Sequence, residues 1–128
     1  MSSVARRPVV LIVEDDLLIR LNAAQIIEEA EFDVIEASNA DEAIAILEDR
    51  SDITVLFTDI QMPGSMDGLK LAAAVRGRWP PIKIVATSGL VNIRADDLPE
   101  GGRFLPKPYS PTQLTATLQQ LTVNPHGS

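Results

Sequence analysis

Short, nearly continuous apolar runs alternate along this chain with longer segments in which apolar residues recur at helical spacing. The apolar runs have the length of buried strands and predict five of them, at residues 8–13, 33–37, 54–58, 82–87 and 103–105. The segments that follow them predict five helices, at residues 17–30, 40–47, 66–78, 90–98 and 111–121. Strands that alternate with helices form a parallel sheet covered on both faces. The pattern therefore predicts an α/β fold with a doubly wound, five-stranded parallel sheet.

Several of the expected helix ends carry residues that start or stop a helix for a physical reason. Ser38-Asn39 offers an N-cap, with Glu42 as a possible capping partner. Ser110 followed by Pro111 and then Gln113 has the pattern of a capped first turn. These residues fix where two of the helices begin.

Two further expectations concern the helix faces and the shortest helix. In the first helix one face should contain the apolar positions Ile19, Ala23, Ile26, Ile27 and Ala30. The fourth helix, 90–98, should be short because Pro99 and Gly101-Gly102 follow it directly.

Composition narrows the class of protein. A chain of 128 residues with 45% apolar content fits one domain, expected over 1–123 with a loose tail at 124–128. No apolar run approaches the length of a membrane span, and without cysteine there is no disulfide framework or thiolate metal site. These observations predict a cytoplasmic protein that does not bind a membrane.

The charge of the chain argues against one class of partner. Its formal net charge is −7, and its lysines and arginines are scattered. Binding to nucleic acid requires clustered basic residues that displace the counterions of the phosphates. We therefore expect no nucleic-acid partner.

Polar residues follow the predicted strands at their carboxyl ends. Glu14 and Asp15 come after the first strand, Asp59 after the third, Thr87 or Ser88 after the fourth, and Lys107 after the fifth. In open α/β sheets the ligand site lies outside these strand ends. Each residue alone has an ordinary explanation, such as a turn, a helix cap or a solvated surface position. Their common placement at one edge favours a functional site.

The charges at this edge indicate a chemistry. Carboxylates from two loops repel one another unless a cation lies between them, and Mg²⁺ suits such a set because it binds few carboxylates and keeps water and phosphate as ligands. Asp59 could then act as a nucleophile that accepts a phosphoryl group as an acyl phosphate. Lys107 and a hydroxyl from Ser88 could neutralise or bind the phosphoryl oxygens.

Four motifs in this order closely resemble the receiver domain of bacterial two-component response regulators, the CheY-like fold. The resemblance covers roughly 8–121, and the motifs are Val10-Leu11-Ile12-Val13-Glu14-Asp15-Asp16, Asp59-Ile60-Gln61-Met62-Pro63 with Asp67-Gly68, Thr87-Ser88-Gly89, and Lys107-Pro108. It implies a (βα)5 flavodoxin-like sheet with strand order 2-1-3-4-5. It also implies a phosphorylation-dependent switch in a phosphorelay rather than an enzyme acting on external substrates.

The resemblance assigns roles to individual residues. Asp59 matches the phosphoacceptor. Mg²⁺ would be held by Glu14, Asp15 and Asp59 together with the main-chain carbonyl of Gln61. Ser88 matches the switch hydroxyl, with Thr87 as the alternative. The lysine that pairs with the phosphate is Lys107, in a cis peptide bond with Pro108, and Phe104 matches the aromatic switch position.

The resemblance further implies partners. The phosphoryl donor would be a phosphohistidine on a histidine kinase or on a histidine phosphotransfer protein, and a downstream protein target would read the modified form. The protein would be a monomer or a phosphorylation-dependent dimer. It departs from the family in Glu14 as the first acid, in the extra residue at Gly64-Ser65, and in the short segment between Ser88 and Lys107.

The sequence also leaves other functions open. A module cut from a hybrid kinase or larger regulator, and a degenerate receiver that binds partners without phosphorylation, fit the same residues. A dehalogenase-type phosphatase needs an acid where Gln61 stands. A flavodoxin-like cofactor binder needs hydroxyls and amides where Glu14-Asp15-Asp16 would repel a phosphate.

Overall fold

Five parallel strands form one sheet in the order β2-β1-β3-β4-β5 in the computed structural model, which describes residues 7–62, 64, 66–89 and 93–122. The strands are β1 (Val9–Val13), β2 (Asp33–Ala37), β3 (Ile53–Asp59), β4 (Lys83–Ser88) and β5 (Arg103–Pro106). All four neighbouring pairs are parallel. The predicted doubly wound fold and its strand order are confirmed, and each strand end lies within one residue of its predicted position.

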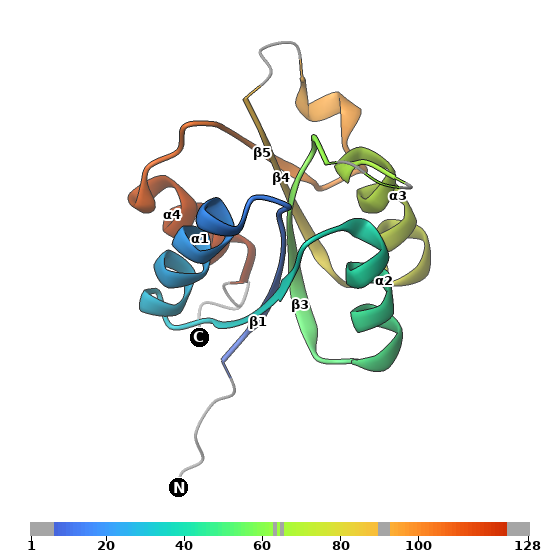
Figure 1. Cartoon of the computed structure of the whole chain (residues 1–128), viewed down its shortest axis with the longest axis horizontal. Helices are drawn as coiled ribbons and strands as arrows, with labels where there is room; N and C mark the ends of the chain where they lie inside the picture. The colour runs from blue at the N-terminus through green and yellow to red at the C-terminus, as the bar shows by residue number, and fades with distance from the viewer. Residues whose placement is uncertain (1–6, 63, 65, 90–92, 123–128) are drawn as a thin grey trace, which may run out of the picture.

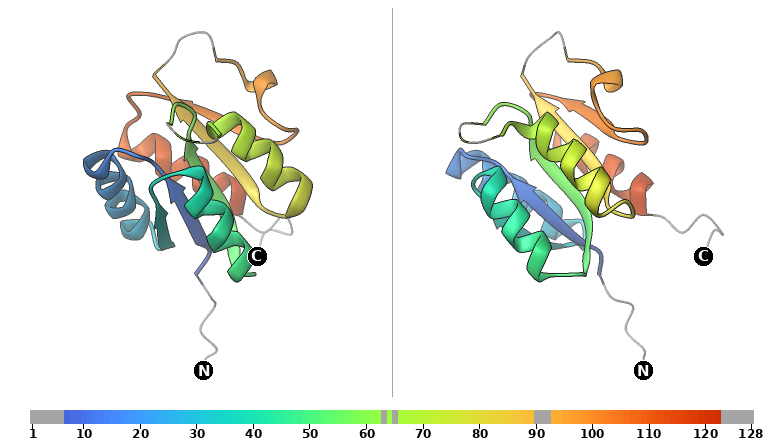
Figure 2. Two further views of the ribbon diagram at one scale, coloured as in Figure 1. Left: turned by 45° about the vertical axis from the view of Figure 1, so that its right-hand side comes forward. Right: turned by 90° about the vertical axis from the view of Figure 1, so that its right-hand side faces the viewer.

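Helices cover both faces of this sheet (Figures 1 and 2). Helices α1 (Leu17–Glu29) and α4 (Pro111–Thr122) lie on one face, and α2 (Ala40–Asp49) and α3 (Gly68–Arg78) lie on the other. Successive residues of a strand point to opposite faces. Accordingly, Val10 and Ile12 pack in the cluster with α1 and α4, while Leu11 and Val13 pack in the cluster with α2 and α3.

The predicted helix caps are present in the structure. Asn39 Oδ1 accepts a hydrogen bond from the Glu42 amide at 2.8 Å, and Glu42 Oε1 accepts one from the Ser38 amide at 2.7 Å. The capping partner of Glu42 is therefore Ser38 rather than Asn39 itself. At α4, Gln113 and Ser110 exchange side-chain and backbone hydrogen bonds of 2.8 and 3.1 Å, as the capping-box pattern predicts.

The connection from β4 to β5 differs most from its prediction. Residues 90–92 of the expected fourth helix lie outside the described residues, and the described remainder forms only the 3-10 turn Ala95–Asp97. Asp97 Oδ2 accepts a hydrogen bond from the Arg94 amide, which closes this turn. The Gly102 amide then bonds to the Pro99 carbonyl at 2.9 Å. A proline and a second turn follow so closely that an α-helix cannot continue.

The buried part of α1 is narrower than its apolar face. Ala23, Ala24 and Ile27 are buried, but Ile19 is 38% exposed. Ile19 belongs to the first helical turn, which begins only after β1 has ended at Val13. It shares the helical spacing of the apolar face but does not belong to the buried core.

Two aromatic residues lie near opposite ends of the strands. Trp79 follows α3, packs against the core and is stacked under the Arg78 guanidinium at 4.4 Å. Tyr109 follows β5 and meets the Phe57 ring edge-on, with ring centroids 5.9 Å apart. Among the described residues, no helix has the length and apolar character needed to cross a membrane.

Candidate phosphoryl-transfer and metal site

The loop after β1 holds the first acidic pair. The Glu14 amide donates to the Ala37 carbonyl at the end of β2, at 3.1 Å, and the Glu14 side chain is buried. Asp16 caps α1 by accepting from the Ile19 amide at 3.1 Å. Asp15 lies between them and is exposed. A buried strand that leads directly into a capped helix therefore fixes Glu14 at the carboxyl end of the sheet.

Asp59 is the last residue of β3 and is only 6% exposed. The chain just after it is held on two sides, because the Ile60 amide donates to the Thr87 carbonyl and the Gly68 amide donates to the Ile60 carbonyl. A Cβ atom at Gly68 would lie 2.1 Å from the Asp59 carbonyl oxygen. Glycine is therefore required for α3 to approach β3 at this point.

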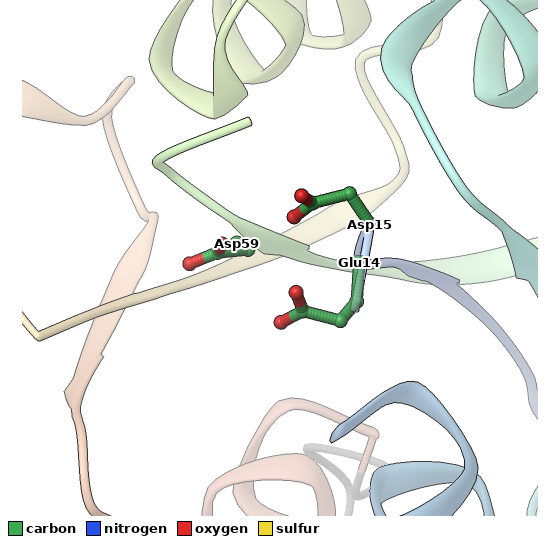
Figure 3. Close-up of side chains that lie close together, drawn as sticks. All are labelled: Glu14, Asp15 and Asp59. Carbon is green, nitrogen blue, oxygen red and sulfur yellow. The ribbon is translucent and has the colours of Figure 1, made fainter. Parts of the chain in front are cut away.

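The three acids meet at one place (Figure 3). Glu14, Asp15 and Asp59 each offer a carboxylate oxygen, and these oxygens all lie within 4.8 Å of one another. Carboxylate oxygens are the donors preferred by hard divalent cations such as Mg²⁺. The donor set therefore fits a divalent cation. The Gln61 main-chain carbonyl as a further ligand stays a prediction.

Lys107 is the cation of the site. Its Nζ lies 3.3 Å from Glu14 Oε1 and 3.3 Å from Asp59 Oδ1. The Lys107 amide donates to the Ser88 carbonyl at 2.9 Å, and the following bond to Pro108 is cis, as predicted. The lysine side chain thus bridges the loop after β1 and the end of β3.

Burial dominates the electrostatics of the two inner acids. It raises the pKa of Asp59 above its ordinary value, and the nearby Lys107 charge offsets only part of that increase. Burial also raises the pKa of Glu14, against the hydrogen bond from the Asp16 amide. For Lys107, burial lowers the pKa, but Asp59 and Glu14 together outweigh it and the pKa is raised. The lysine is therefore a fixed positive charge at neutral pH.

The hydroxyl candidates occupy neighbouring positions at the end of β4. Ser88 Oγ donates to Gln61 Oε1 at 3.3 Å, so it reaches the loop that follows Asp59. Thr87 lies in register with Asp59, and its buried Oγ1 has no hydrogen-bond partner among the described residues. Either hydroxyl is close to the phosphoacceptor along the sheet, and the choice of Ser88 over Thr87 stays a prediction.

Phe104 lies on β5 beside a small apolar cluster. It is half-buried and packs against Ile60, Ala86 and Leu98. Ile60 directly follows Asp59, so this cluster touches the chain next to the phosphoacceptor. That position is consistent with the predicted role of Phe104, which no contact tests directly.

Sequence reasoning missed three residues that shape the site. Arg20 bonds to the Glu14 carbonyl, Gly68 allows α3 to approach Asp59, and Tyr109 packs beside Phe57. Burial raises the pKa of Tyr109, which follows Lys107 by two residues in the chain. Only Gly68 had a visible signal, as part of the Asp67-Gly68 motif.

Comparison with known proteins gives a family. Residues 10–119 match the family model described as the response regulator receiver domain. A curated relative, the sensor kinase CckA of Brucella abortus, is 33% identical over 116 residues, which cover 88% of this chain and 12% of that protein. The chain thus spans a small part of this relative's length.

Solved structures resemble the chain along nearly its whole length. A response regulator receiver protein from Sinorhizobium medicae has a TM-score of 0.83 and 27% identity, covering 90% of this chain and 94% of its own. The receiver domain of the hybrid histidine kinase CckA has a TM-score of 0.76 and 30% identity, covering 90% and 99%. The first is described as a receiver protein, and the second as a receiver domain of a kinase.

Proposed function

This chain belongs to the response regulator receiver domain family, and from that premise we propose that it is a phosphorylation-dependent switch whose phosphoacceptor is Asp59. The phosphoryl donor is a phosphohistidine on a histidine kinase or histidine phosphotransfer protein. The modified form binds a downstream protein. The cytoplasmic location stays part of this proposal.

One observation carries the proposal. Three carboxylates converge within 4.8 Å, and Lys107 Nζ contacts two of them at 3.3 Å. Glu14 and Asp59 are the buried charged side chains of the described residues. They therefore belong to a site whose acids can bind a divalent cation and whose lysine can bind an anion. Because phosphoryl transfer depends mainly on positioning and on neutralising charge, this combination suits it.

The step itself balances without a further reactant. An Asp59 carboxylate oxygen attacks the phosphorus atom, the phosphorus–nitrogen bond to the donor imidazole breaks, and its electron pair returns to the nitrogen, which takes up a proton. Bound Mg²⁺ would supply charge neutralisation for the phosphoryl oxygens. Lys107 binds another of those oxygens, and the hydroxyl of Ser88 donates a hydrogen bond to a third.

The protein is proposed to act by binding rather than by turnover of external substrates. An Asp nucleophile of the phosphatase type needs a second acid two residues later, and that position is Gln61. The expected reactions are the phosphorylation of Asp59 and its slow hydrolysis.

The first turns of α1 offer the surface on which the donor would dock. The large apolar side chains that are exposed in the described part of the chain all lie there, and Leu18 is the most exposed at 77%. They are Leu17, Leu18, Ile19 and Leu21. This α1 patch directly follows Glu14-Asp15-Asp16, so a donor contacting it would reach Asp59. Exposed apolar patches of this kind mark protein interaction sites.

Labelling with a small phosphodonor tests the proposal. With Mg²⁺ and acetyl phosphate the wild type should gain one phosphoryl group by intact mass, and Asp59→Asn should gain none. Asp33→Asn, an exposed acid at the other end of the sheet, serves as the matched control and should label normally. Wild-type protein that stays unmodified under these conditions would refute the proposal.

The α1 patch is tested by comparing two donors. Leu18→Ser should slow transfer from a phosphohistidine protein by roughly 10-fold, which corresponds to the loss of one well-packed contact. Labelling by acetyl phosphate should not change, because a small donor needs no docking surface. Equal slowing with both donors would show that the substitution disturbs the site rather than docking.

A further inference from the structure

Arg20 has a place in the structure that the proposed reaction does not account for. We infer that Arg20 is a positioning residue, which holds the Glu14 main chain to β2 and so fixes the Cα–Cβ bond from which the Glu14 carboxylate extends into the site. The inference rests on the proposed function only in treating Glu14 as a metal ligand. Its geometrical part stands on the contacts of Arg20 itself.

The Glu14 backbone is held on both sides of its Cα atom. On one side its amide donates to the Ala37 carbonyl at 3.1 Å, and on the other its carbonyl accepts from Arg20 Nη1 at 2.9 Å. These two hydrogen bonds fix the peptide planes before and after the residue. Two fixed planes determine where the Cα–Cβ bond points, and the Asp16 amide and Lys107 Nζ, at 3.1 and 3.3 Å, then hold the carboxylate at the end of the side chain. The second plane also leads into Asp15, the neighbouring acid.

Arg20 can hold this carbonyl because its own guanidinium is anchored. Nε donates to Glu36 Oε1 at 3.0 Å, so one planar group joins the loop after β1 to the end of β2. The Arg20 charge also acts on Glu42 at the start of α2, where it adds to the hydrogen bonds from Ser38 that lower the pKa of Glu42. Only arginine presents donors in a rigid fork that can meet two acceptors in this way.

The Arg20 side chain is more deeply buried than that of Arg78, another helix arginine that forms an ion pair. The Arg20 side chain is 16% exposed, whereas that of Arg78, which pairs with Glu48, is 52% exposed. Exposed pairs contribute little because water and salt screen them. A half-buried arginine that donates to a main-chain carbonyl is a stronger constraint. Arg78 is therefore a matched control that has the same chemistry without the contact to the site.

Replacing Arg20 should increase the mobility of the Glu14 backbone more than that of the core. Arg20→Met keeps the apolar stem but loses both hydrogen bonds. Arg20→Lys keeps the charge but cannot span the Glu14 carbonyl and Glu36 together. Arg78→Met removes an arginine from an equivalent pair at the opposite end of the sheet.

Two measurements test the inference, and the first needs no metal. Amide hydrogen exchange of Glu14, taken relative to the Leu56 amide in β3, should be about 10-fold faster in Arg20→Met and unchanged in Arg78→Met. The Mg²⁺ dissociation constant, from amide chemical shifts in a MgCl₂ titration, should rise about 10-fold in Arg20→Met and less in Arg20→Lys. Arg78→Met should stay within about 2-fold of the wild type.

The outcomes separate this inference from the proposed function. Wild-type exchange at Glu14 together with wild-type Mg²⁺ affinity in Arg20→Met would overturn the role of Arg20. Equal changes in Arg20→Met and Arg78→Met would also overturn it, because they would reflect general destabilisation. If the wild type itself binds no Mg²⁺, the proposed function fails while the exchange measurement still decides whether Arg20 holds Glu14. If Arg20→Met does not fold, Arg20→Lys and Glu36→Gln take its place in both measurements.

Discussion

At the β1–α1 side of the site, Glu14 is joined to β2 through the Ala37 carbonyl and through Arg20, by hydrogen bonds of 3.1 and 2.9 Å. At the β4–β5 side, the described residues contain one 3-10 turn, and Phe104 packs there against a cluster of only three buried residues. The Glu14 backbone on the first side is thus held by two hydrogen bonds, whereas Phe104 on the second side is held by apolar contacts. Lys107, which follows β5, joins the two sides through its ion pairs with Glu14 and Asp59. We therefore expect phosphoryl transfer to depend on the polar bonds more than on the apolar cluster around Phe104.

Gly68→Ala should lower the stability of the protein most, because Gly68 packs against the Asp59 backbone, at the centre of the site. A Cβ atom 2.1 Å from the Asp59 carbonyl must displace backbone, and we expect a loss of about 3 kcal/mol in the free energy of unfolding together with poor labelling. Gly77→Ala is the control, since nothing lies within 4 Å of a Cβ there. It should stabilise α3 by about 0.5–1 kcal/mol in a urea titration. Similar losses in both variants would show that helix propensity, and not contact with Asp59, determines the change in the free energy of unfolding.

Lys107→Met tests whether the polar bonds that join the two sides carry the chemistry. The substitution leaves two buried acids without their cation, and we expect acetyl phosphate labelling to slow by roughly 100-fold, as when one charge-stabilising donor is removed from an active site. Lys70→Met, an exposed lysine on α3, should leave the rate unchanged. A rate that fell by less than about 3-fold in Lys107→Met would remove the lysine from the reaction and weaken the comparison.

Leu98→Ala probes the apolar side. Leu98 is 7% exposed and packs with Ile60 and Ala86, so truncation should lower the free energy of unfolding by about 2 kcal/mol. Labelling of Asp59 should stay within about 3-fold of the wild type, because no polar contact of the site is lost. If Leu98→Ala slowed labelling as much as Lys107→Met, the apolar cluster would matter for phosphoryl transfer as much as the polar bonds of the site.

When no divalent metal is present, Asp59→Asn should change the stability of the fold least. Whether the stability rises or falls is informative. Because burial raises the folded pKa of Asp59 above 3.8, the ionised carboxyl weakens the fold at neutral pH. The variant should therefore raise Tm at pH 7 by about 2–4 °C, the shift that ~1 kcal/mol produces. This gain should shrink as the pH falls through the folded pKa toward 3.8, where the native carboxyl is protonated too. A lower Tm for Asp59→Asn at pH 7 would mean that Lys107 more than compensates for burial.

The sequence predicted the strands, the helix caps and the acids of the site because each depends on local pattern or on strand ends. Glu14, Asp59 and Lys107 follow strands, and parallel strands bring their carboxyl ends to one edge. The structure brings these residues within ion-pair distance. Their detailed roles in phosphoryl transfer stay predictions.

What the sequence could not predict depends on contacts between elements. Arg20 is one of several scattered arginines until the fold places it between the Glu14 carbonyl and Glu36. Ile19 has helical spacing like the buried residues of α1, but the helix begins beyond the end of β1 and leaves it exposed. The described part of the segment before β5 forms only the 3-10 turn Ala95–Asp97, which is bounded by the turn at Pro99 and Gly102.

The two aromatic residues at opposite ends of the strands give the protein a pair of built-in spectroscopic probes. The chain has one tyrosine and one tryptophan, and Tyr109 follows Lys107 by two residues while Trp79 follows α3. Each therefore gives a single set of side-chain signals of its residue type in an NMR spectrum. A signal that moves at Tyr109 alone reports a local change of charge, and one that moves at both reports a change that has crossed the domain.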